Sequence, residues 1–390
     1  MKRDHFAPRP DWQERCNEIG FDFHSIPSSD GTPYWQEGVA YRFSAQQIDA
    51  IDDATNALYI LCMEHAAAIV ENGNYPAEYG FNEREISLIE QSWKRQDLDL
   101  YGRFDLAFDG TAIKMLEFNG DTPTGLLEAS VAQWNWLQEA ENVPNRDQFN
   151  SLHEQLKASW SFIAAKYPRG TRFHFTATNE GGREDWGNLE YIADTCVQAG
   201  YDISLIAIEN IGWDKAGRHF VDEAEKPIDV AFKLYPWEWL TREEFGRNLL
   251  RADTRWIEPP WKMLLSNKAL LPLLWQRFPN HKYLLETHFD TGVQPQAGSW
   301  VRKPLLAREG ANIQKIVGGQ AVPISGSDFH PAYDKNGYVY QQWIDLPTFE
   351  GFQPLVGSWV VGGKAAGIGI REDRNDVTGN DSHFVPHYFI

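Results

Sequence analysis

Four polar side chains on two neighbouring segments have the residue types of a metal and anion site. Arg103 and Asp105 lie in GRFDLAFDG, and Glu117 and Asn119 lie in the following MLEFNG. Two carboxylates and an amide oxygen are hard ligands, which suit Mg²⁺ or Mn²⁺ better than zinc. A guanidinium beside them could hold an anionic substrate. The alternative is that these charges face solvent as cross-strand ion pairs.

These side chains meet only if the two segments pair as a β-hairpin in the right register. Residues 102–119 have the pattern of a strand, a turn at Asp109-Gly110 and a second strand. A two-residue loop would pair Asp105 with Lys114 and mix polar and apolar residues on both faces, whereas a loop of three or five residues separates them. We therefore predict a polar face of Arg103, Asp105, Glu117 and Asn119. The opposite face is then apolar except for Lys114, and consists of Phe104, Leu106, Phe108, Leu116 and Phe118.

Two lysines are candidates for binding phosphate groups. The sequence has no GxxxxGK[ST] motif, and VGGKAAGIGIRED is more typical of a hairpin turn than of a phosphate loop. Lys268 lies in LLSNKALLPLLW, where a helix is expected to begin. Lys303 lies at the end of the predicted strand WVRKPLLA, and the glycine-containing segment REGAN follows it. Such a loop could cover a triphosphate, although surface lysines and an ordinary hairpin loop would explain the same pattern.

The spacing of apolar residues predicts an α/β (α+β) protein with mixed sheets. A helix is expected over 44–72, and a second over about 125–140, capped by Thr122 or Thr124 beside Pro123. Strand and helix patterns then alternate, which predicts a partly parallel sheet. Glycine-rich turns separate short strands towards the end, which predicts an antiparallel C-terminal part. The expected segments are strands at 172–178, 202–208, 229–234, 299–307, 337–345 and 357–373, and a helix at about 185–199.

Composition argues against several classes of function. The formal net charge of −19 over 390 residues opposes a nucleic-acid partner, which needs clustered cations. Cys16, Cys62 and Cys196 form no CxxC motif and cannot all pair, which favours a reducing compartment. No apolar run approaches the roughly 20 residues of a membrane span, and the N-terminus lacks the apolar core of a signal peptide. We expect a cytoplasmic protein without nucleic-acid or membrane partners.

In their order and spacing, a series of short motifs resembles the synthetase domain of glutathionylspermidine synthase. The motifs include YWQEGVAYRFS, YGRFDLAF, MLEFNGDTPTG, LYPWEWL, SNKALLPLLW, WVRKPLLAREGAN and GIREDRNDVTGNDSHFVPH. The resemblance implies an ATP-grasp-type acid–amine ligase. Its lysines follow its metal residues, as in the circularly permuted glutathione synthetase-like arrangement. It also implies a single synthetase unit over 1–390 without the N-terminal amidase domain of bifunctional members. The approximate lobes are 1–165 with the metal hairpin, 166–260 for substrate, and 261–390 for nucleotide.

The resemblance also implies a role for each matching residue. Asp105, Glu117 and Asn119 match Mg²⁺ ligands that bridge the phosphates of ATP. Arg103 matches the residue that contacts nucleotide, orients the substrate carboxylate and stabilises charge in the transition state. The nucleotide-binding positions match Lys268, Lys303, Gln341, Gln342, Trp343, Ile344 and Arg371. The loop over the triphosphate matches 309–316, with contacts from Glu309, Gly310, Ala311, Asn312 and Ile313. The substrate contacts match Thr122, Thr124 and Glu184.

The implied reaction needs these groups because a carboxylate is a poor electrophile. Phosphorylation by ATP would convert it to an acyl phosphate, which an amine attacks to give an amide, ADP and phosphate. Arg103 would cover the developing oxyanion, and two metal ions would neutralise the transferring phosphoryl group. Closure of the 309–316 loop would exclude water.

Two positions depart from the family pattern and bear on the substrates. The serine-rich contact to glutathione appears here as Thr122 and Thr124. In NEGGREDWG, Arg183 stands where one carboxylate of a polyamine-binding acidic pair is expected, and Glu184 is retained. A cation at 183 should repel spermidine. We therefore expect a small carboxylate, such as a glutathione-like peptide, and an amine that need not be a polyamine.

Two other classes of function compete with the ligase. A catalytically inactive, ATP-grasp-derived protein would bind nucleotide or peptide without turnover, although all proposed metal and phosphate residues are present. A glycosidase would use Asp105 and Glu117 as paired carboxylates, but Lys268 and Lys303 would then have no role.

Overall fold

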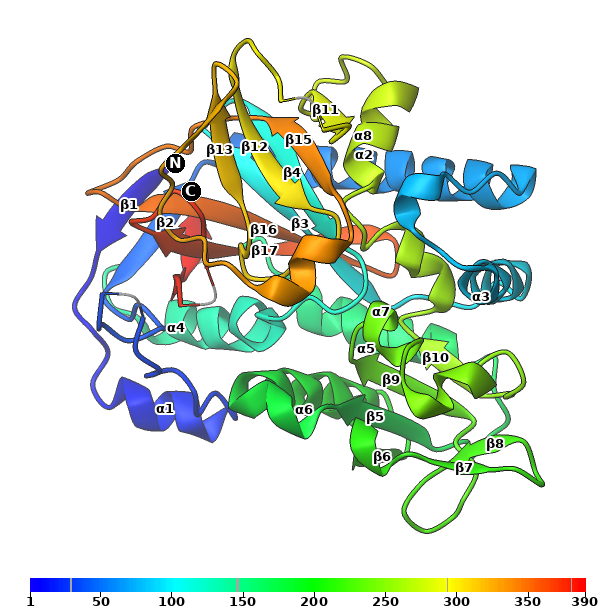
Figure 1. Cartoon of the computed structure of the whole chain (residues 1–390). Coiled ribbons are helices and arrows are strands. Elements are labelled where there is room, and N and C mark those ends of the chain that lie inside the picture. Colours follow the sequence, from blue (N-terminus) through cyan, green and yellow to red (C-terminus); the bar gives the residue numbers. More distant parts are fainter. Residues whose placement is uncertain (29, 145–146, 293, 380) are drawn as a thin grey trace.

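The predicted hairpin lies inside a five-stranded antiparallel sheet (Figure 1). The computed structural model describes residues 1–28, 30–144, 147–292, 294–379 and 381–390. The strand order is β18-β17-β16-β3-β4, and Asp105 lies directly opposite Gly357. Segments far apart in the sequence therefore form one sheet. Its strands are β3 (Tyr101–Phe108), β4 (Ile113–Asn119), β16 (Gln353–Val361), β17 (Lys364–Asp373) and β18 (His383–Val385).

The register of β3 and β4 confirms the predicted polar face. Arg103 pairs with Asn119, and Asp105 pairs with Glu117. Directly opposed residues of an antiparallel pair project on the same side of the sheet. All four polar side chains consequently share one face.

The loop and the apolar face differ from the prediction. Phe108 pairs with Ile113, so the loop has four residues, 109–112, rather than three or five. An irregularity of the bulge type at Leu116 then shifts the register by one residue before the polar pairs begin. The assignment of Leu116 to the apolar face is wrong. Met115 takes that place in the core, while Leu116 lines a cavity.

A second five-stranded antiparallel sheet contacts the hairpin at this irregularity. Its order is β11-β15-β12-β13-β14. Lys303 Nζ donates to the carbonyl of Leu116 at 3.2 Å, and Gln341 Nε2 donates to the carbonyl of Met115 at 3.3 Å. The strands are β11 (Thr287–Phe289), β12 (Ser299–Pro304), β13 (Gln314–Val317), β14 (Gln320–Val322) and β15 (Tyr338–Gln342). The predicted C-terminal antiparallel part is confirmed.

A four-stranded parallel sheet forms the predicted α/β part. Its order is β10-β9-β5-β6, and every pairing is parallel. The strands are β5 (Phe173–Ala177), β6 (Ile203–Ala207), β9 (Val230–Leu234) and β10 (Arg255–Ile257). The helices α5 (Leu152–Ala164) and α6 (Gly182–Gln198) lie between this parallel sheet and the sheet that contains the β3–β4 hairpin (Figure 1). The three lobes predicted from the sequence stay a prediction.

A buried ion pair joins the parallel sheet to the loop after β4. Lys233 Nζ on β9 bonds Asp121 Oδ1, and both side chains are almost fully buried. The other carboxylate oxygen accepts from the backbone N–H of Trp237 at 2.9 Å, and the lysine lies 4.6 Å from the centre of the Trp237 ring. This pair fixes the 120–125 loop against the end of β9.

Most of the remaining elements are helices around these sheets. The helix predicted over 44–72 is α2 (Ala45–Asn72), which begins with a capping box of Ser44 and Gln47. The other helices are α1 (Trp12–Glu18), α3 (Glu83–Lys94), α7 (Trp237–Leu240) and α8 (Leu270–Arg277). The small strands are β1 (Lys2–His5), β2 (Val39–Phe43), β7 (Gly212–Asp214), β8 (His219–Val221) and β19 (His387–Phe389).

The helix predicted over 125–140 forms, but its cap is wrong. A π-helical turn, Glu128–Ala132, leads into α4 (Gln133–Glu139). The side-chain oxygen of Asn188 on α6 accepts from the backbone N–H groups of Leu126 and Leu127 at 2.8 and 3.3 Å. A residue distant in sequence therefore satisfies the helix start, which leaves Thr122 and Thr124 available to the cavity.

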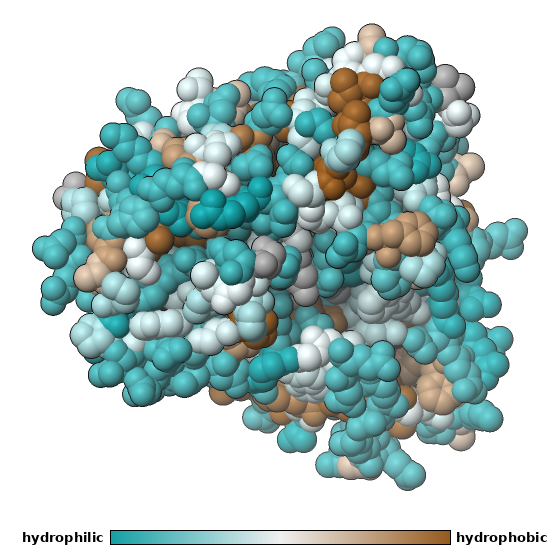
Figure 2. Space-filling view, turned by 60° about the vertical axis from the view of Figure 1, so that its left-hand side comes forward, coloured by the Kyte–Doolittle hydropathy of each residue, from teal (hydrophilic) through white to brown (hydrophobic). Residues whose placement is uncertain are grey.

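The surface matches the acidic, hydrophilic composition. Figure 2 shows a mostly hydrophilic face with a few separate hydrophobic patches. Within the described residues, no helix is both long and apolar enough to cross a membrane. Cys16, Cys62 and Cys196 are all buried and unpaired, and burial raises the pKa of each thiol. The cytoplasmic location stays a prediction.

Replacing Lys233 by Met should lower the free energy of unfolding by about 3–5 kcal/mol, because Asp121 would remain as a buried, unpaired charge. Urea unfolding followed by circular dichroism measures the change. The double variant Asp121→Asn/Lys233→Met should recover most of the loss. A double variant as unstable as the single one would show that the charge pair is not the cause.

Candidate active site

One large cavity collects residues from all three main sheets. Its volume is about 990 Å³, at the upper end of the range usual for ligand pockets. The polar face of the β3–β4 hairpin lines it, as do Lys303 on β12 and Arg371 on β17. Thr178, Ile208 and Tyr235, which follow the carboxyl ends of β5, β6 and β9, line it from the parallel sheet. This edge of a parallel sheet commonly binds ligands.

Arg103 and Asp105 form the centre of the site. The Arg103 guanidinium donates to both carboxylate oxygens of Asp105, at 2.7 and 3.1 Å, and to the carbonyl of Thr124 at 2.6 Å. Arg371 Nη2 lies 3.2 Å from Asp105 Oδ2. A Cβ at Gly357 would come within 2.9 Å of Arg103 Cδ, so glycine at this position leaves room for the arginine.

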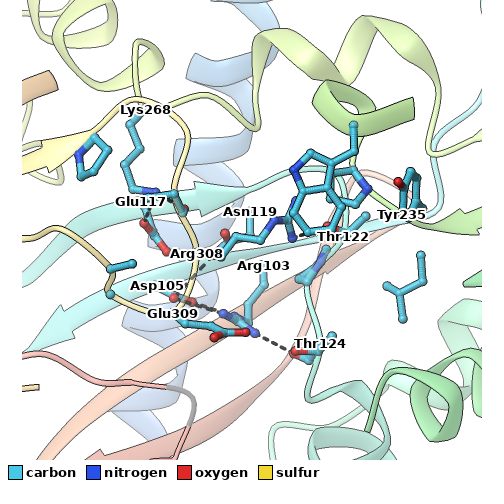
Figure 3. Close-up of a pocket in the computed structure, with 18 of the residues that line it drawn as sticks. Arg103, Asp105, Glu117, Asn119, Thr122, Thr124, Tyr235, Lys268, Arg308 and Glu309 are labelled. Atoms are coloured by element: carbon cyan, nitrogen blue, oxygen red, sulfur yellow. Dashed lines mark hydrogen bonds and ion pairs between the residues drawn. The ribbon is translucent and has the colours of Figure 1, made fainter. Parts of the chain in front are cut away.

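The two predicted lysines converge on Glu117. Lys268 Nζ lies 3.2 Å from Glu117 Oε2, and Figure 3 shows the two side chains pointing toward each other. Burial would raise the pKa of Glu117, but Lys268 and Lys303 outweigh it and lower the pKa to about 2. Burial lowers the pKa of Lys303 to about 8, although Glu117 opposes the shift. The cluster therefore contains an ionised carboxylate and a lysine that titrates near physiological pH.

The proposed metal ligands lie together and have chemistry that fits Mg²⁺. Asn119 Nδ2 lies 3.2 Å from Glu117 Oε1 and 3.5 Å from Asp105 Oδ2. These residues can offer two carboxylates and an amide oxygen, which is a hard donor set. Among the described residues, no three His, Cys, Asp or Glu side chains are grouped so that they could hold a metal ion. The set proposed here contains only two such side chains, because its third donor is the amide of Asn119. In the structure, arginines and lysines balance the two carboxylates.

The predicted nucleotide segment lines the cavity beside the lysines. Gln341, Gln342, Trp343 and Ile344 all face it, together with apolar side chains such as Leu116, Val301, Ile313 and Leu355. Lys303 Nζ donates to Gln341 Oε1 at 2.8 Å. This end of the cavity is thus partly apolar and adjoins the cationic cluster.

The predicted triphosphate loop borders the cavity, and four of its five predicted contact residues line it. Glu309, Gly310, Ala311 and Ile313 line it. Asn312 is buried outside the lining, where its side chain donates to the carbonyl of His330 and accepts from that residue's backbone N–H. These bonds hold the base of the loop. The nucleotide-contact role predicted for Asn312 stays a prediction.

The sequence analysis missed Arg308, which adjoins the loop and lines the cavity. Its Nη1 donates to Thr122 Oγ1 at 2.7 Å, its Nη2 lies 3.4 Å from Glu238, and the guanidinium lies 5.5 Å from the centre of the Trp239 ring. The only signal in the sequence was its place directly before Glu309 in the REGAN segment. Arg308 brings a further cation close to Thr122.

The end of the cavity at the parallel sheet is acidic. Glu180, Glu184, Asp185, Glu209, Glu243 and Glu244 line it. Burial, together with Glu128 and Asp185, raises the pKa of Glu184 to about 8, and burial raises the pKa of Asp185 to about 6. In Figure 3, Tyr235 lies on the opposite side of the site from Lys268, with Arg103 between them. The cavity therefore has a cationic end and an anionic end.

The inference drawn from Arg183 is wrong. Its guanidinium pairs with Asp22 at 2.7 Å and with Glu190 at 2.7 Å, and it does not line the cavity. Because α6 turns this side chain away while Glu184 and Asp185 line the cavity, Arg183 does not place a positive charge in the anionic end.

Comparison with known proteins identifies the family. The family model described as "Glutathionylspermidine synthase preATP-grasp" matches residues 3–390. A Haemophilus influenzae protein named "Putative acid--amine ligase" is 49% identical over 388 residues, which cover 99% of this chain and 98% of that protein. A trypanothione synthetase of Crithidia fasciculata and a bifunctional glutathionylspermidine synthetase/amidase of Escherichia coli are each 25% identical, over 83% and 85% of this chain. The chain spans only 52% and 56% of those two proteins.

A solved structure shows the same fold. A glutathione synthetase-like effector from Globodera pallida superposes with a TM-score of 0.55 at 11% sequence identity, covering 97% of this chain and 96% of that one. The predicted glutathione synthetase-like, ATP-grasp-type fold is confirmed. The relatives also confirm the predicted enzyme class, a carbon–nitrogen ligase. With its whole length matched by the family model, this chain belongs to the glutathionylspermidine synthase family.

Proposed function

We propose that this enzyme is an ATP- and Mg²⁺-dependent acid–amine ligase, which joins a small carboxylic acid to a cationic amine through an acyl phosphate. One observation carries the proposal: a single cavity contains Mg²⁺-type donors, lysines suited to phosphate and an acidic end. Each of the three reactants thus meets a region of matching chemistry.

The cationic end suits the nucleotide. When bound, ATP would supply the phosphoryl group and Mg²⁺ would neutralise its charge, with Asp105, Glu117 and Asn119 as ligands. Lys268 and Lys303 would hold phosphate oxygens. Residues 341–344 and nearby apolar side chains would hold the base. Binding of Mg²⁺ would release Asp105 and Glu117 from their present basic partners, which would then be free to contact anions.

The centre suits the carboxylate substrate. Arg103, Arg308 and Arg371 present three guanidinium groups to this part of the cavity, and Thr122 and Thr124 border it. The carbonyl of Thr124 also holds Arg103, and this bond would keep the guanidinium in place towards developing negative charge when Mg²⁺ takes Asp105.

The acidic end suits an amine that arrives as a cation. A bound ammonium group would favour the ionised forms of Glu184 and Asp185, which burial opposes in the free enzyme. An ammonium cannot attack an acyl phosphate until it loses a proton. Glu184, once ionised beside the ammonium, is our candidate to accept that proton, because its raised pKa makes it a stronger base than an ordinary carboxylate.

The Asp105→Asn variant should lose both turnover and metal-dependent stabilisation, because the amide keeps an oxygen donor but removes a negative charge that balances Mg²⁺. The wild-type enzyme should release ADP only when ATP, Mg²⁺, a carboxylic acid and an amine are all present. A coupled assay of ADP release measures turnover, and the thermal shift with Mg·ATP measures metal-dependent stabilisation. Incubation of the enzyme with a metabolite pool, followed by mass spectrometry, identifies the product. Glu90→Gln on the exposed side of α3 is the control. Normal Mg·ATP stabilisation in Asp105→Asn would refute the metal assignment.

Nucleotide affinity should fall as pH rises above about 8, because Lys303 loses its charge there. Its lowered pKa means that it is protonated below about 8 and neutral above, whereas bound phosphate would favour the protonated form. Titration calorimetry with a non-hydrolysable ATP analogue at pH 7 and pH 9.5 measures the change. The Lys303→Arg variant stays charged at both values and should show a smaller difference. An equal difference in the variant would rule out Lys303 as its source.

Glu184→Gln should stabilise the free enzyme at high pH while weakening amine binding. The raised pKa means that ionisation of Glu184 costs the folded state stability, so this loss grows as pH rises from about 4.5 to about 8. Thermal unfolding at pH 5 and pH 9 should show a larger gain for the variant at pH 9. Glu180→Gln, on the exposed rim, should show no such gain. A stabilisation of Glu184→Gln that is equal at both pH values would contradict this explanation.

A further inference from the structure

Beneath the acidic rim, the amine end of the cavity has a buried apolar floor. Five lining residues there are only 3–7% exposed: Ile211, Phe220, Leu234, Leu240 and Trp256. The proposed phosphate and metal chemistry uses none of them. A large apolar surface beside a polar reaction centre is typical of a specificity pocket.

The floor is built from packed aromatic side chains. Phe220 on β8 meets Trp256 on β10 edge to face, with ring centres 5.6 Å apart, and Trp213 packs against the other side of Phe220 at 5.1 Å. Trp237 lies 6.3 Å from Trp256. Such contacts hold the rings in place, so the floor is formed before a ligand arrives.

The rim above the floor is mainly acidic. Glu180, Glu209, Glu243 and Glu244 are exposed, whereas the floor residues are buried, so the carboxylates lie nearer the solvent. Among the described lining residues, the lysines and arginines are Arg103, Lys268, Lys303, Arg308 and Arg371. Of these, Arg308 reaches towards the parallel sheet, where its Nη2 lies 3.4 Å from Glu238 and its guanidinium lies 5.5 Å from the centre of the Trp239 ring. The carboxylates of the rim can attract a cationic group, and the uncharged part of the same ligand can then pack on the apolar floor.

We propose that the amine substrate carries an apolar body, aliphatic or aromatic, which lies on this floor while its ammonium group faces Glu184 and Asp185. The inference rests on the proposed function. A polyamine lying there would place charged groups against apolar side chains, at a desolvation cost. An apolar body gains about 25 cal/mol for each Å² that it buries. A cavity of about 990 Å³ has room for this group besides a nucleotide.

Two monoamines of equal charge, with a polyamine for comparison, separate the contribution of the floor from that of the rim. Titration calorimetry with Mg²⁺ and a non-hydrolysable ATP analogue would compare ethylamine, 2-phenylethylamine and spermidine. We expect 2-phenylethylamine to bind at least about tenfold tighter than ethylamine, and tighter than spermidine. Equal binding of the two monoamines, or tighter binding of spermidine, would overturn the inference.

Two variants locate the effect. Phe220→Ser should remove most of the preference for 2-phenylethylamine, while Phe329→Ser, at a position 71% exposed and outside the cavity lining, should keep it. Ile211→Ala serves the same purpose if Phe220→Ser does not fold. A preference that survives the floor variant would overturn the inference. Failure of the proposed function is distinct, because it appears as absence of ADP release with every acid and amine, whatever the binding preference.

Discussion

The candidate site depends on the one-residue shift in the pairing of β3 with β4 at Leu116. On the loop side of the shift, apolar residues face the core, and on the far side Asp105 and Glu117 stand opposite each other. Because side chains alternate along a strand, a regular hairpin with the same four-residue loop would place Glu117 on the apolar face. The second sheet bonds to the carbonyls of Met115 and Leu116. The irregularity therefore also brings Lys303 to the site.

Opposite charges organise the cavity from this point outward. Each carboxylate of the hairpin is matched by cations from β17, β12 or the segment before α8. At the parallel sheet, burial outweighs the nearby arginines and raises the pKa values of Glu184 and Asp185. The carboxylates of the hairpin therefore already have cationic partners, whereas a bound cation would stabilise the ionised forms of Glu184 and Asp185. In the proposed reaction, this asymmetry would direct anionic and cationic reactants to opposite sides of Arg103.

Local patterns allowed the main elements and the polar face to be predicted from the sequence. The 44–72 helix, the alternation after 171 and the hairpin all have spacings that reflect which side is buried. The predictions failed where a distant residue decides the outcome. The cap of the 126–139 helical segment comes from Asn188, and Arg183 turns away because Asp22 and Glu190 bind it. The shift at Leu116 is supported by contacts from another sheet. Arg308 gained its place from Thr122 and Trp239, which are remote in sequence.

The burial of all three cysteines has a practical consequence. With their thiols shielded and their pKa values raised, Cys16, Cys62 and Cys196 should resist alkylation by maleimides in the folded state. A single cysteine introduced at the exposed position of Phe329 would then be the only site to take up a fluorescent dye. Residues 328 and 330 bond to Asn312 at the base of the loop beside the nucleotide end. Such a dye could report the position of that loop without interference from the native thiols.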